Sequence, residues 1–214
     1  AEPPPQGDVP MSYAFSTHTW APNDIVYAGC IEGELLAYDV RSGESLVETS
    51  IALREDPLEP GPAITALAVT KTHVLVADAS GHVKWYVHGE YHMTFVLRLP
   101  ETGLASLVIE PTTFKRLVLG TKEGVVRVVD LLKDIASVHM NADDDNSTAL
   151  DNVELSDLGD FHAGPVTGVA CFPRSSRMIT AGHDGTLRLW DTTARRCHAK
   201  LHFPSPLKTL ALTR

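Results

Sequence analysis

Short apolar runs, separated by turns, follow one another along most of the chain. Four of these runs, DIVYAG, HVLVAD, RLVLGT and RMITAG, are rich in the residues that favour strands, and each leads into a turn that contains glycine. A second run follows each turn: ELLAYD, HVKWYV, VVRVVD and TLRLWD. Apolar residues spaced at the helical period are nearly absent. The pattern predicts an all-β chain built from hairpins whose turns use glycine.

The four hairpins are copies of one unit. Their turn glycines are Gly33, Gly81, Gly124 and Gly185, which lie 48, 43 and 61 residues apart. A third apolar run precedes each hairpin and a fourth follows it, so each unit predicts a four-stranded antiparallel sheet. The first two separations are close to the roughly 40–45 residues of a β-propeller blade, and the third contains a polar insertion. We therefore predict a β-propeller with about four blades in this chain.

The units also define the expected boundaries. Residues 1–10 are proline-rich and predict a linker. The partial propeller spans 11–214, and its elements are the blades at 11–52, 63–100, 104–140 and 162–203, an acidic inserted loop at 141–160, and the start of another blade at 206–214. The surplus run at the end predicts part of a larger ring. The alternative is that residues 207–212 replace a weak strand at 13–20 and close a small ring.

The fourth unit has the motifs of a known family. The sequence HAGPVTGVACF followed by TAGHDGTLRLWD resembles a WD repeat of the β-propeller family. The resemblance extends from about Met11 over nearly the whole chain, but it is weaker in the first three units, which lack the tryptophan and the upstream histidine. It implies a ring of about seven blades. It also implies a structural tetrad in which a histidine joins an aspartate to a hydroxyl that binds the tryptophan N–H. The tetrad residues would be His162, Thr180, Asp184 and Trp190.

The same residues admit a catalytic interpretation, because a hydroxyl, a histidine and an aspartate can form a nucleophilic triad. A triad needs an exposed nucleophile and an oxyanion hole. Thr180 instead lies inside a strand pattern, with Trp190 predicted over it, and a buried indole N–H needs an acceptor. We therefore expect a structural role, no catalytic residue and no cofactor. The HGEYH stretch at 88–92 predicts a hairpin loop, because its glutamate is misplaced for a helical zinc motif.

The polar insertion partly matches a calcium-binding loop. Asp143, Asp145, Ser147, Asp151 and Glu154 occupy positions 1, 3, 5, 9 and 12 of the EF-hand pattern. The residue at position 6 is Thr148, where the sharp turn requires glycine, and no helical pattern flanks the loop. We therefore expect a flexible acidic loop without bound metal. Its acidic residues are candidates for partner binding: Asp143, Asp144, Asp145, Asp151 and Glu154.

Charge and composition narrow the classes of function. The net charge of −9 argues against nucleic-acid binding, and no apolar run is long enough to suggest a membrane span. The charge is uneven: residues 134–173 hold eight acidic residues and no Lys or Arg, whereas residues 174–214 hold eight basic residues and only two acidic ones. Nothing suggests a small-molecule substrate. We therefore expect a non-catalytic scaffold that binds other proteins in a multi-subunit assembly.

A second resemblance bears on which assembly this is. The stretch THTWAPNDIVYAGCIEGELLAYD (Thr17–Asp39) resembles the opening repeats of the large cilia- and flagella-associated WD-repeat proteins, such as members 43 and 44. It implies a cytoplasmic or cytoskeletal protein of the ciliary or flagellar axoneme that tethers dynein or regulates motility, with dynein or microtubule-associated proteins as partners. The alternative is a substrate receptor of a ubiquitin ligase or of another cytoplasmic complex. Such receptors often carry Trp-Asp-x-Arg, but here Thr193 stands in place of the arginine.

Overall fold

The chain is described by a computed structural model that covers residues 14–21, 24–44, 46, 51–52, 61–91, 93–99, 103–131 and 153–212. Sixteen strands and no α-helix occur in these residues. Accordingly, none of the described segments is a helix that could cross a membrane.

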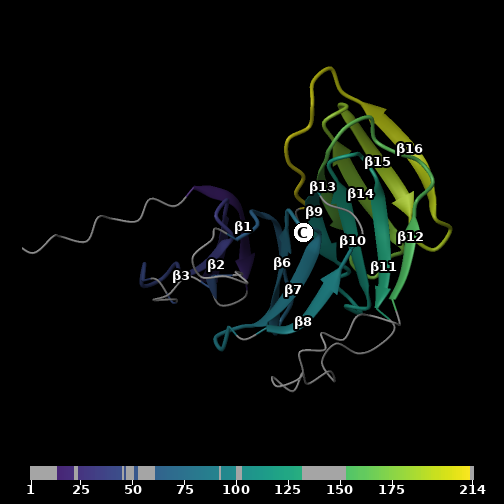
Figure 1. Cartoon of the computed structure of the whole chain (residues 1–214). Helices are drawn as coiled ribbons and strands as arrows, with labels where there is room; N and C mark the ends of the chain where they lie inside the picture. The colour runs from purple at the N-terminus through teal and green to yellow at the C-terminus, as the bar shows by residue number, and fades with distance from the viewer. Residues whose placement is uncertain are drawn as a thin grey trace, which may run out of the picture.

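The strands form four separate sheets, each with four antiparallel strands in chain order from the inside outward (Figure 1). We call them blades 1 to 4. Blade 1 contains β1 (Phe15–Ala21), β2 (Ile25–Cys30), β3 (Glu34–Asp39) and β4 (Ile51–Ala52). Blade 2 contains β5 (Ile64–Val69), β6 (His73–Asp78), β7 (His82–Val87) and β8 (Met93–Arg98). Blade 3 contains β9 (Leu104–Ile109), β10 (Arg116–Thr121), β11 (Val126–Leu131) and β12 (Val153–Asp157). Blade 4 contains β13 (Val166–Cys171), β14 (Arg177–Gly182), β15 (Thr186–Asp191) and β16 (Arg196–His202). The prediction of an all-β chain with about four blades is confirmed.

One predicted boundary is wrong. From the sequence, blade 3 is predicted to end at residue 140, and 141–160 is predicted to be an inserted loop. In the structure the outer strand of blade 3 is β12, which pairs with β11 through partners such as Val129 and Leu155. The segment Val153–Asp157 alternates apolar and polar residues, as an outer strand does, but the acidic residues around it hid this pattern. Residues 132–152 lie outside the described part of the chain.

The inner strands β1, β5, β9 and β13 lie side by side in that order. Hydroxyl groups on these strands bind the next blade. Ser16 Oγ donates to the Ile64 carbonyl at 2.5 Å, and Ser106 Oγ donates to the Val166 carbonyl at 2.9 Å. Each bond crosses from one blade to its neighbour and fixes the spacing of the inner strands.

The core consists of three apolar layers, one between each pair of adjacent blades. Tyr27 and Leu35 of blade 1 pack against Ile64 of blade 2, and all three are fully buried. Trp85 of blade 2 packs in the layer shared with blade 3. Trp190 of blade 4 packs in the layer shared with blade 3. Each blade thus buries its apolar face against the next one along the chain.

The far face of blade 4 differs from the others. Ile179, Leu187 and Leu189 are only half-buried there, although they occupy the same positions as residues that are fully buried in the other layers. The segment 205–212 runs beside β13: the Thr167 hydroxyl donates to the Leu207 carbonyl at 2.8 Å, as Ser16 does to Ile64. The segment therefore takes the place of an inner strand next to blade 4, although no strand is assigned to it.

Candidate functional site

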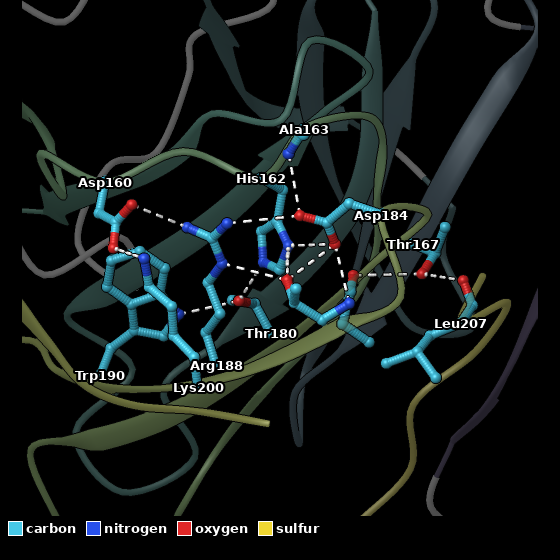
Figure 2. A network of polar contacts seen from close by, with 12 residues as sticks. Asp160, His162, Ala163, Thr167, Thr180, Asp184, Arg188, Trp190, Lys200 and Leu207 are labelled. Atoms are coloured by element: carbon cyan, nitrogen blue, oxygen red, sulfur yellow. Dashed lines mark hydrogen bonds and ion pairs between the residues drawn. The ribbon is translucent and has the colours of Figure 1, made fainter. Parts of the chain in front are cut away.

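The four residues predicted as a structural tetrad come from three parts of blade 4 and the segment before it. His162 lies between β12 and β13, Thr180 lies on β14, and Asp184 lies in the turn between β14 and β15. Trp190 lies on the neighbouring strand β15. Met178 pairs with Trp190 and Thr180 pairs with Arg188, so Trp190 and Thr180 are diagonal neighbours on the same face of the sheet. The structure brings all four side chains together at the interface with blade 3 (Figure 2).

The four side chains form one chain of hydrogen bonds. Trp190 Nε1 donates to Thr180 Oγ1 at 2.8 Å, and Thr180 Oγ1 lies 2.7 Å from His162 Nε2. His162 Nδ1 lies 3.1 Å from Asp184 Oδ1. Figure 2 shows these contacts running from the indole to the carboxylate. Thr180 and Trp190 are fully buried, and His162 is 2% exposed.

The contacts fix the tautomer of the histidine. Thr180 Oγ1 accepts from the indole, so its own proton is free to go to His162 Nε2. The other ring nitrogen then carries the proton and donates to Asp184. Burial lowers the pKa of His162, and the nearby Arg188 cation adds to this effect, although the contact with Asp184 opposes it. The histidine is therefore neutral in the folded protein at neutral pH.

Asp184 is ionised and surrounded by donors. The Ala163 N–H and Arg188 Nη2 donate to Oδ2, and the Thr186 N–H and hydroxyl donate to Oδ1. Burial opposes ionisation of the carboxyl, but these hydrogen bonds outweigh it and hold the pKa of Asp184 far below its ordinary value. The Asp184 carboxylate, in the turn between β14 and β15, thus binds both the segment before β13 and the strand β15.

Gly182 is required by this close packing. A Cβ atom at this position would lie 2.2 Å from His162 Nδ1 and 2.5 Å from Asp184 Oδ1. Any side chain would therefore displace the His162–Asp184 contact. This explains the glycine that precedes His183 in the motif TAGHDG.

Three charged residues that the sequence analysis did not assign extend the network to the surface. Arg188 is almost fully buried and contacts Asp184 at 3.3 Å and Asp160 at 3.0 Å. Lys200, on the outer strand β16, lies 2.5 Å from Asp160. A signal was present, because Arg188 interrupts an apolar strand two residues before Trp190 on the same face. A buried arginine needs acidic partners, and two are within reach.

The geometry does not support nucleophilic catalysis. Thr180 Oγ1 is fully buried, and both of its hydrogen-bonding roles are satisfied inside the protein. His162 is likewise engaged at both ring nitrogens. A nucleophile must be reachable by its substrate, with donors placed to receive an oxyanion. These four residues instead fasten blade 4 internally and against blade 3.

At the interface between blades 1 and 2, a tyrosine and a histidine contact each other instead of a histidine, a threonine and a tryptophan. The Tyr27 hydroxyl lies 2.7 Å from His88 Nδ1, and His88 Nε2 lies 3.1 Å from the Thr70 carbonyl. The two rings are stacked with centroids 5.5 Å apart. His88 lies in the turn between β7 and β8, where the sequence predicted a hairpin loop. This histidine also serves packing between blades.

Blade 2 also stabilises its hairpin turn differently. Asp78 is fully buried at the end of β6, the position that Gly182 holds in blade 4. Its carboxylate accepts from the Ser80 N–H at 2.9 Å and from the His82 N–H at 3.1 Å. Lys84 lies 3.4 Å from the other oxygen, in the same sheet position as Arg188. This cluster was not predicted from the sequence, because only the fourth unit carries the tetrad motif.

Of the acidic residues proposed for calcium or partner binding, only Glu154 lies in the described part of the chain. Asp143, Asp144, Asp145, Ser147 and Asp151 lie outside the described residues. Glu154, position 12 of the calcium pattern, lies in β12, where an EF-hand would begin its second helix. Within the described residues, no group of three or more His, Cys, Asp or Glu side chains is placed to hold a metal ion.

Comparison with known proteins agrees with the fold. Residues 157–191 match the WD40 family model, described as "WD domain, G-beta repeat". The β-propeller domain of Myceliophteria thermophila Cps50 (Swd1) superposes with a TM-score of 0.70 at 14% identity, covering 95% of this chain and 60% of that one. U3-55K and the WD40 repeats of RRP9 each give a TM-score of 0.66 at 14% identity, covering 90% of this chain and 52% of theirs. No curated protein sequence matches the chain significantly.

At this identity the structural likeness shows the fold, and the chain spans only 52% to 60% of these three chains. The matched WD40 repeat contains His162, Thr180, Asp184 and Trp190. The repeat and the propeller neighbours together support the WD-repeat family.

Proposed function

We propose that this WD-repeat chain is a non-catalytic scaffold that binds other proteins within a larger assembly. The observation that carries the proposal is that the reactive side chains of blade 4 form hydrogen bonds within the protein and are not open to a substrate. The hydroxyl, imidazole and carboxylate of the blade 4 network bind one another and the backbone. The turns at 41–44, 111–113 and 193–195 are exposed to solvent, and such turns are the usual binding elements of a rigid β-scaffold.

The scaffold proposal is tested by the size and composition of the native assembly. The full-length protein, tagged at its genomic locus, is sedimented from cell extract at low salt. We expect it to migrate well above its monomer mass together with partners in fixed ratio. Migration as a free monomer, with no partner that crosslinks to the blades, would contradict the proposal.

Within this class, we propose an axonemal role in dynein tethering or in the regulation of ciliary motility. The support is the residue pattern over Thr17–Asp39, which covers most of β1 and all of β2 and β3 in blade 1. The partners would be axonemal dynein or microtubule-associated proteins. The alternative is a substrate receptor of a ubiquitin ligase, for which Thr193, where those receptors often carry arginine, is unfavourable.

Microscopy of the tagged protein in ciliated cells separates these alternatives. We expect the signal along axonemes, resistant to detergent extraction, and reduced beating when the gene is disrupted. Diffuse cytoplasmic signal with copurifying ligase subunits would overturn the axonemal proposal and leave the scaffold proposal intact.

The acidic segment is a proposed contact for a basic partner surface. Its core is Asp143, Asp144 and Asp145, outside the described residues. Replacing these three with asparagine should weaken binding of the native partner at low salt and have little effect at high salt, because salt screens exposed charges. Equal binding of both forms at low salt would rule out this role.

A further inference from the structure

A groove lined mainly by charged and hydroxyl-bearing residues lies between blades 3 and 4, at the end of the molecule opposite the Asp184 turn. It has a volume of about 740 Å³. Two turns form its walls, the turn between β9 and β10 and the turn between β13 and β14, and the end of β11 forms its base. Its lining residues include Glu110, Thr112, Lys115, Arg174, Ser175 and Ser176.

Hydrogen bonds between the blades hold the two walls together. The Arg174 N–H of blade 4 donates to Thr112 Oγ1 of blade 3 at 2.8 Å. Arg116 Nη1 of blade 3 donates to Thr192 Oγ1 of blade 4 at 3.0 Å. Arg195 of blade 4 lies 4.0 Å from Asp130 of blade 3. The groove is therefore formed before any ligand binds, and a ligand would not have to order its walls.

The acidic groups at the groove are already engaged. Glu110 accepts from the Thr112 and Thr113 N–H groups at 2.8 Å, within its own turn. Asp130 accepts from Arg116 Nε at 2.7 Å and also faces Arg195. Neither carboxylate needs a cation from a ligand.

Two cations at the groove have no such partner. Lys115 on blade 3 and Arg174 on blade 4 are exposed, and neither forms an ion pair with another residue that the structure describes. The Ser175 hydroxyl accepts a hydrogen bond from the Arg177 N–H at 3.1 Å, which leaves its proton available to a ligand. The groove thus offers an ammonium, a guanidinium and one hydroxyl, all as donors.

The charged residues that the structure describes around the groove are mostly basic. The cations Lys115, Arg116, Arg174 and Arg195 outnumber the anions Glu110 and Asp130 there, in a chain with a net charge of −9. The overall negative charge opposes a nucleic-acid ligand, whose phosphates need many cations. The open groove, with its two free cations on opposite walls, fits an extended ligand that carries more than one carboxylate.

We propose that this groove binds an acidic segment of a partner protein, with glutamate or aspartate carboxylates on Lys115 and Arg174. One carboxylate would bind the Arg174 guanidinium, which can donate two parallel hydrogen bonds, and Ser175 lies beside it in the same turn. A second carboxylate would bind Lys115 on the other wall. The inference rests on the proposed scaffold function and specifies one surface that it would use.

The test measures binding of a fluorescein-labelled peptide in which glutamates alternate with glycines, by fluorescence polarisation at low salt. The control peptide carries glutamine in place of each glutamate. The groove variant is Lys115→Gln with Arg174→Gln. The matched variant is Lys71→Gln with Arg98→Gln, which removes two exposed cations from blade 2 and leaves the groove unchanged. Circular dichroism and thermal melting establish that both variants are folded.

We expect the acidic peptide to bind the wild type and the blade 2 variant alike, and the groove variant about tenfold more weakly, because two charge-assisted contacts are lost. Amide NMR signals of residues 110–116 and 174–177 should shift on titration. An equal loss of peptide affinity in the groove variant and the blade 2 variant would indicate general charge attraction and would overturn the groove proposal. Equal binding of the glutamine peptide, or no binding at all, would also overturn it.

The experiments distinguish failure of the groove proposal from failure of the scaffold proposal. If the groove variant still assembles with its native partners in the sedimentation experiment, and the peptide does not bind, only the groove proposal is wrong. If the native protein is a free monomer, the scaffold proposal is wrong whatever the peptide does.

Discussion

Replacing Thr180 with valine removes the hydroxyl that joins the indole to the imidazole and keeps the shape of the side chain. Trp190 Nε1 then loses its acceptor at 2.8 Å, and His162 Nε2 loses its donor at 2.7 Å. Both groups are buried, and each unsatisfied buried group costs about 1–3 kcal/mol. The extra methyl of valine returns at most about 0.8 kcal/mol. We therefore expect the free energy of unfolding to fall by about 3 kcal/mol.

The assay for this variant is urea unfolding followed by far-ultraviolet circular dichroism, with the midpoint and slope fitted together. Thr193→Val is the matched control, because Thr193 is exposed in a turn, and it should change stability by less than about 0.5 kcal/mol. Adding Trp190→Phe to Thr180→Val should cost less than the sum of the two single changes, because both act on one hydrogen bond. A Thr180→Val protein as stable as the wild type would show that the Thr180 hydroxyl does not stabilise blade 4.

Three further predictions follow from the same contacts. The pKa of His162 is lower in the folded protein than in the unfolded chain, so the unfolded chain binds more protons below about pH 6.5. The free energy of unfolding should therefore fall on acidification by up to about 1.4 kcal/mol per pH unit. Thermal melts at several pH values should show this fall in the wild type and a smaller one in His162→Gln. Gly182→Ala places a Cβ against His162 and should lower the free energy of unfolding by about 1–3 kcal/mol in urea titrations, and an unchanged midpoint would contradict the packing. Val128→Asn in the blade 3–4 layer should cost about 2 kcal/mol more than Leu189→Asn on the half-buried far face of blade 4, and similar melting temperatures would show that the two faces are equally covered.

Much of the fold could be predicted from local patterns. The turn glycines Gly33, Gly81, Gly124 and Gly185 all adopt positive φ angles, which is a backbone requirement that a sequence displays directly. Strand boundaries followed from the apolar runs between these turns. The outer strand β12 could not be found in this way, because its position depends on pairing with β11 across an insertion rather than on its own sequence.

Only the four central residues of the site, His162, Thr180, Asp184 and Trp190, were predictable from the sequence. His162 and Asp184 lie 22 residues apart in sequence, and only the family pattern links them before the structure is known. Arg188 required knowledge of which face of β15 is buried, because the same side chain on the other face would be an ordinary surface charge. The pair of Lys115 and Arg174 could not be found at all, because it depends on how two blades meet.

Hydrogen exchange of the Trp190 indole N–H, observed by NMR, tests most directly the claim that the residues of the TAGHDGTLRLWD motif fasten the blades together. The indole N–H is fully buried and bonded to Thr180, whereas Trp20 is 59% exposed in the same chain and gives an internal reference. We expect the Trp190 signal to persist in deuterated buffer long after the Trp20 signal has gone, and Thr180→Val to shorten its lifetime. Exchange at Trp190 as fast as at Trp20 would show that the four residues do not hold the blades together.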